Sequence, residues 1–197
     1  MSATPVHGVV LAAGRSSRMG SPKPLLRVGA ETFLQHAVRC LREGDCRDVS
    51  IVINSADASV RAHALNTDAT VIENPDARSE QIDSLRLALA AAPQDAAAVI
   101  VLPVDIPAVR ATTVRAVVQA FRERPAPIIV PTYKGVGGHP LLLARIVFDA
   151  VLASDPPEGL RSLLSARADL VLQVHVDDPG IALDVDTPED YAALSDE

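Results

Sequence analysis

The chain has 197 residues, 48% of them hydrophobic, which is enough for one good core and suggests a single domain spanning 1–197. Its formal net charge of −7 at pH 7 excludes a nucleic-acid surface that depends on many phosphate contacts. No run of 18 or more apolar residues occurs, so we expect no membrane-spanning segment and predict a cytoplasmic protein.

The first predicted element is a buried parallel strand over 6–12, which leads into a loop suited to a phosphate ligand. Gly14 and Gly20 let main-chain N–H groups approach a ligand closely. Positive charge comes from Arg15, Arg18 and Lys23, the last being one of only two lysines beside sixteen arginines. The loop matches neither GxxxxGK[ST] nor GxGxxG, which argues against a kinase, a GTPase and a standard dinucleotide-binding fold.

Helical and strand patterns then alternate along the chain. We predict helices over 32–42, 56–65, 84–92 and 112–122, and strands over 49–53, 69–72, 97–102 and 128–130. This alternation indicates an α/β three-layer domain with a largely parallel sheet and right-handed crossovers. Ligands of such sheets bind beyond the carboxyl ends of the strands, where both the 13–23 loop and the turn at 103–107 fall.

The regular alternation stops after Pro131. We predict an excursion at about 131–165 that shapes a substrate-facing wall, with a short strand LLL and a helix over 145–152. Another short helix is expected over 158–165 and a strand over 170–176. Thr187 and Pro188 are predicted to be the N-cap and first residue of a closing helix.

Charge is distributed unevenly between the two ends of the chain. Residues 1–30 contain no Asp or Glu, whereas residues 168–197 contain no Lys or Arg. We therefore predict that the basic N-terminal loop and the acidic C-terminal segment meet at a site that holds both an anion and a metal.

Three aspartates are candidates for that metal. Asp105 follows a buried strand and is well placed to bind Mg²⁺; the alternative is a turn aspartate that caps the next segment. Asp184 and Asp186 alternate around Val185 and so face one side of an extended segment. One of them is a candidate second ligand, and the other could orient a loop or a ribose, although capping of the closing helix explains part of this motif.

His139, in GVGGHPLLL, either hydrogen-bonds an acceptor substrate or fixes its loop. The other histidines have no partner residue at a spacing typical of a catalytic or metal site, and neither do Cys40 and Cys46. We interpret all of them as structural residues. No Ser-His-Asp or Cys-His arrangement is apparent. This absence suits a reaction in which a phosphate, already ionised at neutral pH, is the attacking group.

Five motifs, in this order and at these separations, resemble the MobA-like nucleotidyltransferases over essentially the whole chain: LAAGRSSRMGSPKPLL, SLRLAL, PVDIP, GGHPLLL and DVDTPEDY. The branch that the motifs resemble most is the MocA-type molybdenum cofactor cytidylyltransferases. The resemblance implies a nucleotide-diphospho-sugar transferase-like fold, which is a Rossmann-like sandwich whose mostly parallel, mixed sheet has one antiparallel strand. It also implies Mg²⁺-dependent transfer of CMP from CTP to a molybdopterin-type acceptor, and a recipient molybdoenzyme or its chaperone.

The same resemblance implies roles for individual residues. The triphosphate would be held by Arg18 and Lys23, and Mg²⁺ by Asp105 with Asp184 or Asp186. CTP is expected because the branch that uses GTP has a second glycine at Ala13. Base and ribose would lie against Leu11, Ala12, Ala13, Gly14 and Ser84.

One departure from the family pattern bears on these roles. Relatives have a glycine before the serine of the base-contacting loop, where this chain has ARSEQIDSLR with Glu80 near that position. The alternatives are transfer from GTP or to another phosphorylated acceptor, a NAD(P)H-dependent oxidoreductase on the same fold, and a non-catalytic cofactor chaperone.

Overall fold

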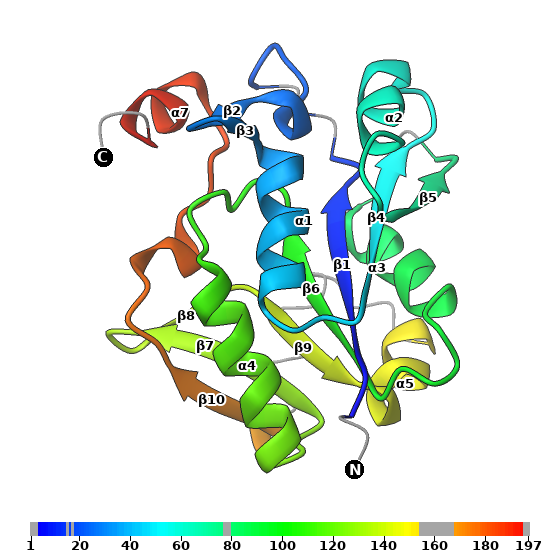
Figure 1. Ribbon diagram of the computed structural model, residues 1–197, viewed down its shortest axis with the longest axis vertical. Helices are drawn as coiled ribbons and strands as arrows, with labels where there is room; N and C mark the ends of the chain where they lie inside the picture. The colour runs from blue at the N-terminus through cyan, green and yellow to red at the C-terminus, as the bar shows by residue number, and fades with distance from the viewer. Residues whose placement is uncertain (1–3, 15, 17, 77–79, 154–167, 195–197) are drawn as a thin grey trace.

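A mixed sheet forms the centre of the protein (Figure 1). The computed structural model describes residues 4–14, 16, 18–76, 80–153 and 168–194. Within them the sheet runs in the order β10-β7-β9-β6-β1-β4-β5, and β8 pairs with β7. Its strands are β1 (Val6–Ala12), β4 (Asp48–Asn54), β5 (Thr70–Asn74), β6 (Ala98–Pro103), β7 (Ile128–Tyr133), β8 (Val136–Gly137), β9 (Leu141–Ala144) and β10 (Val171–His175).

The strands are parallel except for β9 and the two-residue β8. β9 is antiparallel to both of its neighbours, β6 and β7. The remaining pairs, β10 with β7, β6 with β1, β1 with β4 and β4 with β5, are parallel. The mostly parallel mixed sheet expected from the resemblance is therefore confirmed.

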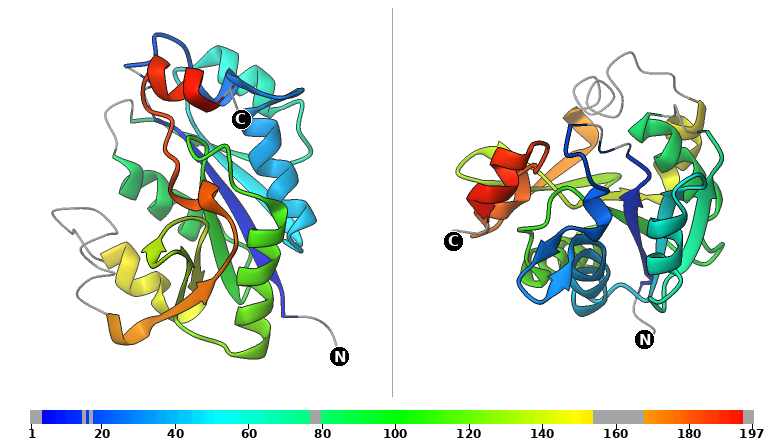
Figure 2. Two further views of the ribbon diagram at one scale, coloured as in Figure 1. Left: turned by 90° about the vertical axis from the view of Figure 1, so that its left-hand side faces the viewer. Right: turned by 90° about the horizontal axis from the view of Figure 1, so that it is seen from above.

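Helices cover both faces of the sheet, so the domain has three layers (Figure 2). One face packs against α1 (Phe33–Glu43), α2 (Ala58–Ala64) and α4 (Ala111–Glu123). The other packs against α3 (Gln81–Ala90) and α5 (Phe148–Ala153). Both cores are mostly aliphatic, with Phe33 and Phe121 in one and Phe148 in the other, and successive residues of β1 from Val9 to Ala12 alternate between them.

The C-terminal helix lies beside a hairpin from the first part of the chain. The small hairpin of β2 (Arg27–Val28) and β3 (Glu31–Thr32) contacts the C-terminal helix α7 (Pro188–Leu194), blue and red in Figure 1. The hydroxyl of Tyr191 donates to the carbonyl of Arg27 at 3.0 Å, and its ring meets Phe33 edge to face. The amide of Asp190 donates to Thr187 Oγ1, which confirms the predicted N-cap.

Most element boundaries differ from the sequence predictions by one or two residues, and three differences are larger. β7 continues through Pro131 to Tyr133, because the carbonyl of Pro131 still accepts from Gly138. α3 begins at Gln81, three residues early, because the Asp83 carboxylate accepts from the amide of Glu80. The predicted helix over 145–152 is a 3₁₀ turn, η2 (Arg145–Val147), followed by α5. The helix predicted over 158–165 lies outside the described residues.

Both cysteines are buried and unpaired, and burial raises the pKa of Cys40 to about 11 and that of Cys46 to about 12. Such thiols stay protonated, which agrees with a packing role. Among the described residues, no helix combines the length and apolar character needed to cross a membrane. The other short 3₁₀ elements are η1 (Lys23–Leu25), η3 (Ala168–Leu170) and η4 (Pro179–Ala182).

Candidate functional site

The candidate site lies at the carboxyl ends of β1 and β6, which are neighbours in the sheet. The amide of Val104, just beyond β6, donates to the carbonyl of Leu11 near the end of β1 at 3.0 Å. This bond brings the loop after β1 and the turn that carries Asp105 to one edge, as the parallel arrangement predicts.

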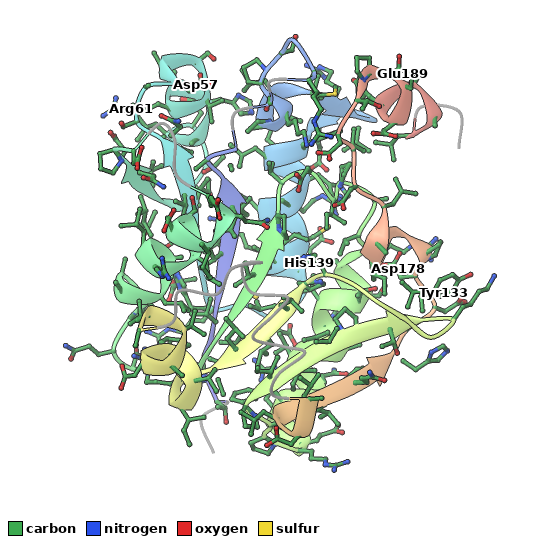
Figure 3. All side chains as sticks on the ribbon, turned by 180° about the vertical axis from the view of Figure 1, so that it is seen from behind. Asp57, Arg61, Tyr133, His139, Asp178 and Glu189 are labelled. Atoms are coloured by element: carbon green, nitrogen blue, oxygen red, sulfur yellow. The ribbon has the colours of Figure 1, made fainter. Side chains whose placement is uncertain are left out.

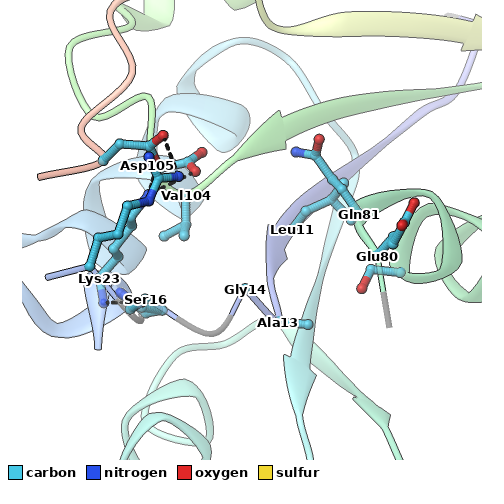
Figure 4. Close-up of a pocket in the computed structure, with 13 residues that line it drawn as sticks. Leu11, Ala13, Gly14, Ser16, Lys23, Glu80, Gln81, Val104 and Asp105 are labelled. Atoms are coloured by element: carbon cyan, nitrogen blue, oxygen red, sulfur yellow. Dashed lines mark hydrogen bonds and ion pairs between the residues drawn. The ribbon is translucent and has the colours of Figure 1, made fainter. Parts of the chain in front are cut away.

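Lys23 connects the parts of the site. Its side chain is 11% exposed, and its ammonium nitrogen Nζ lies 3.2 Å from Asp105 Oδ2 and 2.5 Å from Asp186 Oδ1. Its amide donates to Ser16 Oγ at 2.9 Å, which folds the loop back toward η1. Two carboxylates from distant parts of the chain thus contact one buried cation (Figure 4).

Arg18 adds a second positive charge at Asp186. Its guanidinium lies 2.9 Å from Asp186 Oδ2, and its side chain is 68% exposed. The hydrogen bond from Lys23, with a smaller contribution from Arg18, holds the pKa of Asp186 below its ordinary value. The predicted meeting of the basic N-terminal loop and the acidic C-terminal segment is confirmed.

The C-terminal segment is fixed to the site through Val185. Its side chain is buried, and its amide donates to the carbonyl of Asp105 at 2.9 Å. Asp184 and Asp186 flank it and both line one cavity, as their alternation predicts. Asp186 binds the cationic side chains, whereas Asp184 is exposed.

A cavity of about 310 Å³ opens beside this cluster. In Figure 4 Lys23 and Asp105 lie on one side, Glu80 and Gln81 lie on the other, and Gly14 lies between them. A Cβ at Gly14 would meet nothing within 4 Å, so the main chain there is open to a ligand. The walls also include Leu11, Ala13, Ser16, Arg18, Pro24, Ser84, Val104 and Asp186.

A second cavity of about 720 Å³ adjoins the first. The two share Leu11, Glu80, Gln81, Asp105 and Asp186, so they form one continuous depression. The second cavity extends over the loop before β9, where it is lined by His139, and over Ile181 and Asp184.

Ser84 is buried on the inner face of α3 and accepts a hydrogen bond from Asn74 Nδ2 at 3.2 Å. Its position on the wall of the first cavity agrees with the predicted contact to a base. Glu80, near the position where the sequence lacks the expected glycine, lies just before α3 and lines both cavities. This difference therefore places a carboxylate where the two cavities meet.

The sequence alone did not point to Gln81 or Asp178. Asp178 is 1% exposed, and its Oδ2 accepts from the amide of Arg110 and from Thr113 Oγ1 at 2.9 and 2.6 Å. These partners lie more than 60 residues away, so no local pattern could reveal them. Arg15 and Ser17 lie outside the described residues.

Three comparisons with known proteins bear on this site. The profile of the MobA-like NTP transferase domain matches residues 8–172. The Escherichia coli molybdenum cofactor cytidylyltransferase is 24% identical over 93% of this chain and 92% of its own length. A 2-C-methyl-D-erythritol 4-phosphate cytidylyltransferase of Streptomyces coelicolor is 36% identical over 62% of this chain, and the alignment spans 48% of that protein. The bifunctional protein GlmU of Stenotrophomonas maltophilia and a molybdenum cofactor guanylyltransferase of Opitutus terrae are matched over 25% and 52% of their lengths.

Solved structures share the fold of this chain. Rv0371c of Mycobacterium tuberculosis superposes over 100% of both chains with a TM-score of 0.88 and 32% identity. The manganese complex of Rv0371c gives a TM-score of 0.81 and 29% identity, again over 100% of both chains.

Proposed function

The chain belongs to the MobA-like NTP transferase family, a family of nucleotidyltransferases, and on that basis we propose that it transfers CMP from CTP to the terminal phosphate of a molybdopterin-type acceptor. Pyrophosphate is the second product. The observation that carries the proposal is the contact of Lys23 with both Asp105 and Asp186 at the wall shared by two continuous cavities. A nucleotide fits the smaller cavity and an acceptor the larger.

The loop after β1 is the nucleotide side of the site. Base and ribose lie against Leu11, Ala13, Gly14 and Ser84, and Arg18 and Lys23 contact the triphosphate. Ala12 was also predicted to contact the nucleotide, but it is buried in the core and lines neither cavity. The open main chain at Gly14 and the exposed guanidinium of Arg18 support this assignment, because a polyphosphate needs accessible N–H groups and positive charge.

The carboxylates fit a hard divalent cation. Asp105 Oδ2 and Asp186 Oδ1 already converge on one cationic group, and oxygen-only donors suit Mg²⁺ or Mn²⁺. Among the described residues, no group of three or more His, Cys, Asp and Glu side chains is arranged to hold a metal. This agrees with Mg²⁺, which commonly takes one or two carboxylates and completes its shell with phosphate and water oxygens. Asp184, on the larger cavity, is the alternative second ligand.

A bound Mg²⁺ would neutralise charge on the triphosphate, and the protein's own groups would position the reactants. An oxygen of the acceptor phosphate forms a bond to the α-phosphorus of CTP. The bond from that phosphorus to the β-bridging oxygen breaks, and its electron pair leaves with pyrophosphate. Lys23 and Arg18 stabilise the charge on the phosphates, and no protein base is needed because the acceptor phosphate is already ionised.

The choice of CTP rests on Ala13 and on the relatives. The Ala13 side chain lines the smaller cavity and reduces the room for a purine. The E. coli relative, similar over nearly the whole chain, is named as a cytidylyltransferase. A molybdenum cofactor guanylyltransferase of Opitutus terrae is 39% identical over 56% of this chain, so GTP is the alternative donor.

Pyrophosphate release tests the proposal. Purified protein with Mg²⁺ is given CTP, GTP or ATP together with molybdopterin or 2-C-methyl-D-erythritol 4-phosphate; the second acceptor is chosen because of the Streptomyces relative. We expect release with CTP and molybdopterin and much less with every other pair. No release with CTP and molybdopterin would overturn the proposed pair of substrates, and release with the other acceptor would replace it.

A further inference from the structure

One ring nitrogen of His139, Nδ1, plays no part in holding its loop, whereas the other is hydrogen-bonded to the Val101 backbone. The loop is held by main-chain bonds: the amide of Gly138 donates to Pro131 at 3.0 Å, and that of His139 donates to Ile181 at 2.8 Å. Gly138 packs so closely that a Cβ there would overlap the carbonyl of Ile181. Of the two roles predicted for His139, fixing the loop is therefore already performed by the backbone.

Other histidines show what a structural ring does in this protein. His36 Nε2 lies 3.0 Å from the carbonyl of Val109, and His63 Nε2 lies 2.9 Å from Thr32 Oγ1. Nδ1 of His139 is buried and has no hydrogen-bond partner in the part of the chain that the structure describes; Nδ1 of His7 shares this property, but His7 lines neither cavity, whereas His139 lines the larger one. A buried polar atom left unpaired is uncommon in native proteins and calls for an explanation such as a ligand.

The ring lines the larger cavity, at the loop that precedes β9 (Figure 3). Burial lowers the pKa of His139 to about 4, against a smaller opposing effect of Asp105 and of the Val101 backbone. The imidazole is therefore neutral at neutral pH, and its N–H donates to the Val101 backbone, which leaves Nδ1 as a hydrogen-bond acceptor. A neutral acceptor nitrogen suits an N–H group of a heterocycle better than an ionised phosphate, whose oxygens are themselves acceptors.

The two cavities differ in the charge of their walls, which assigns the charged and the uncharged end of an acceptor to different places. No lysine or arginine belongs to the described residues that line the larger cavity, and much of its wall is aliphatic, including Val101, Leu141 and Ile181. The positive charge lies on the smaller cavity, at Lys23 and Arg18, which contact Asp186 at the junction of the two cavities. The phosphate of an acceptor therefore belongs at that junction and its uncharged body at the aliphatic wall beside His139.

We propose that His139 is a specificity-determining residue that hydrogen-bonds the neutral, nitrogen-containing ring of the acceptor. The inference rests on the proposed function in taking the acceptor to be a phosphorylated heterocycle. His139 lines only the larger cavity, so its contribution is to acceptor affinity and not to nucleotide affinity.

The test uses ligand binding, so that it does not depend on turnover. The quenching of pterin fluorescence on addition of protein gives the affinity for a pterin without nucleotide, and calorimetry gives the affinity for CTP. The variants are His139→Leu, which removes both hydrogen-bonding nitrogens, and His139→Gln, which restores a neutral donor and acceptor. His175→Leu is the matched control, because His175 is exposed on β10 and lines neither cavity.

We expect His139→Leu to weaken pterin binding about tenfold or more, His139→Gln to recover part of it, and all variants to bind CTP like the unmodified protein. If His139→Leu does not fold, His139→Asn decides, because its shorter amide should also lose affinity. Pterin binding unchanged within about twofold would overturn the inference, as would absence of pterin binding by the unmodified protein.

The pyrophosphate assay separates this inference from the proposed function. Pterin binding that depends on His139 without any transfer from CTP would leave the inference standing and refute the proposed activity. Transfer from CTP to a sugar phosphate without pterin binding would refute the inference and leave nucleotidyl transfer standing.

Discussion

Replacing Lys23 with methionine removes the ammonium group that contacts both carboxylates of the site. Methionine has a similar length and keeps the apolar part of a side chain that is only 11% exposed. The substitution leaves the carboxylates of Asp105 and Asp186 without the ammonium that lies between them. Arg18 still contacts Asp186. We expect two opposite effects: loss of catalysis and tighter binding of a metal in the absence of nucleotide.

The size of the metal effect follows from the geometry. The ammonium lies 3.2 Å and 2.5 Å from the two carboxylate oxygens, so a divalent cation bound there lies within a few ångströms of it. At about 4 Å, two unit charges interact by about 1 kcal/mol even in water, and by more at a partly buried site. The side chains of Asp105 and Asp186 are 30% and 38% exposed, so we use the interaction energy in water, about 1 kcal/mol, and double it because the metal ion carries two charges. Removing the ammonium should then tighten Mn²⁺ binding about tenfold or more.

The assays are Mn²⁺ titration followed by electron paramagnetic resonance and pyrophosphate release from CTP. We expect kcat to fall about 10²- to 10³-fold, as for the loss of a preorganised donor to developing charge. Lys134→Met is the control, because Lys134 is the only other lysine and lies over the ring of Tyr133 outside both cavities. Mn²⁺ affinity that is unchanged or weaker in Lys23→Met would refute the placement of the metal at Asp105 and Asp186.

Three further predictions concern other parts of the site. Asp105→Asn should abolish turnover while largely preserving the fold, because an amide is a weaker ligand for Mg²⁺; turnover near that of the unmodified protein, with the thermal midpoint as fold control, would contradict the metal role. Ala13→Gly should raise kcat/KM with GTP relative to CTP several-fold by widening the base pocket, and an unchanged ratio would show that this methyl does not select the base. The pKa of histidine is near 6.5 in the unfolded chain and about 4 for His139 in the folded protein, so between these pH values the unfolded state binds more protons than the folded state. The free energy of unfolding should therefore drop by up to about 3 kcal/mol as the pH falls from about 6.5 to 4. Denaturant titrations of His139→Gln should show a smaller drop over this range, and an equal drop in both proteins would refute the assignment.

The sequence predicted the features that depend on local pattern. The strand before the glycine-containing loop and Asp105 after a second strand follow from hydrophobic runs that end in turn residues. Their proximity follows from the parallel sheet, because parallel strands place their carboxyl ends at one edge. The meeting of the basic N-terminal loop with the acidic C-terminal segment was predicted from the uneven distribution of charge along the chain, although the particular contact between Arg18 and Asp186 was not.

Features that depend on distant pairing were not predicted. β9 lies between β6 and β7, a position that three consecutive leucines cannot specify, because such a run fits any buried strand. The buried carboxylate of Asp178 accepts from the nearby amide of Gly180, but its other donors, Arg110 and Thr113, lie beyond the reach of any sequence window. The sequence left open which role His139 has, and the backbone bonds of its loop were needed to favour a ligand contact.

The most direct test of the account follows the phosphorus atoms of CTP. Protein, Mg²⁺ and molybdopterin are incubated with CTP labelled at either the α- or the γ-phosphorus, and the products are separated. Nucleotidyl transfer predicts that the α-label appears in the acceptor product and the γ-label in pyrophosphate. A γ-label in the acceptor, or no label in the acceptor from either form of CTP, would contradict the assignment of this site.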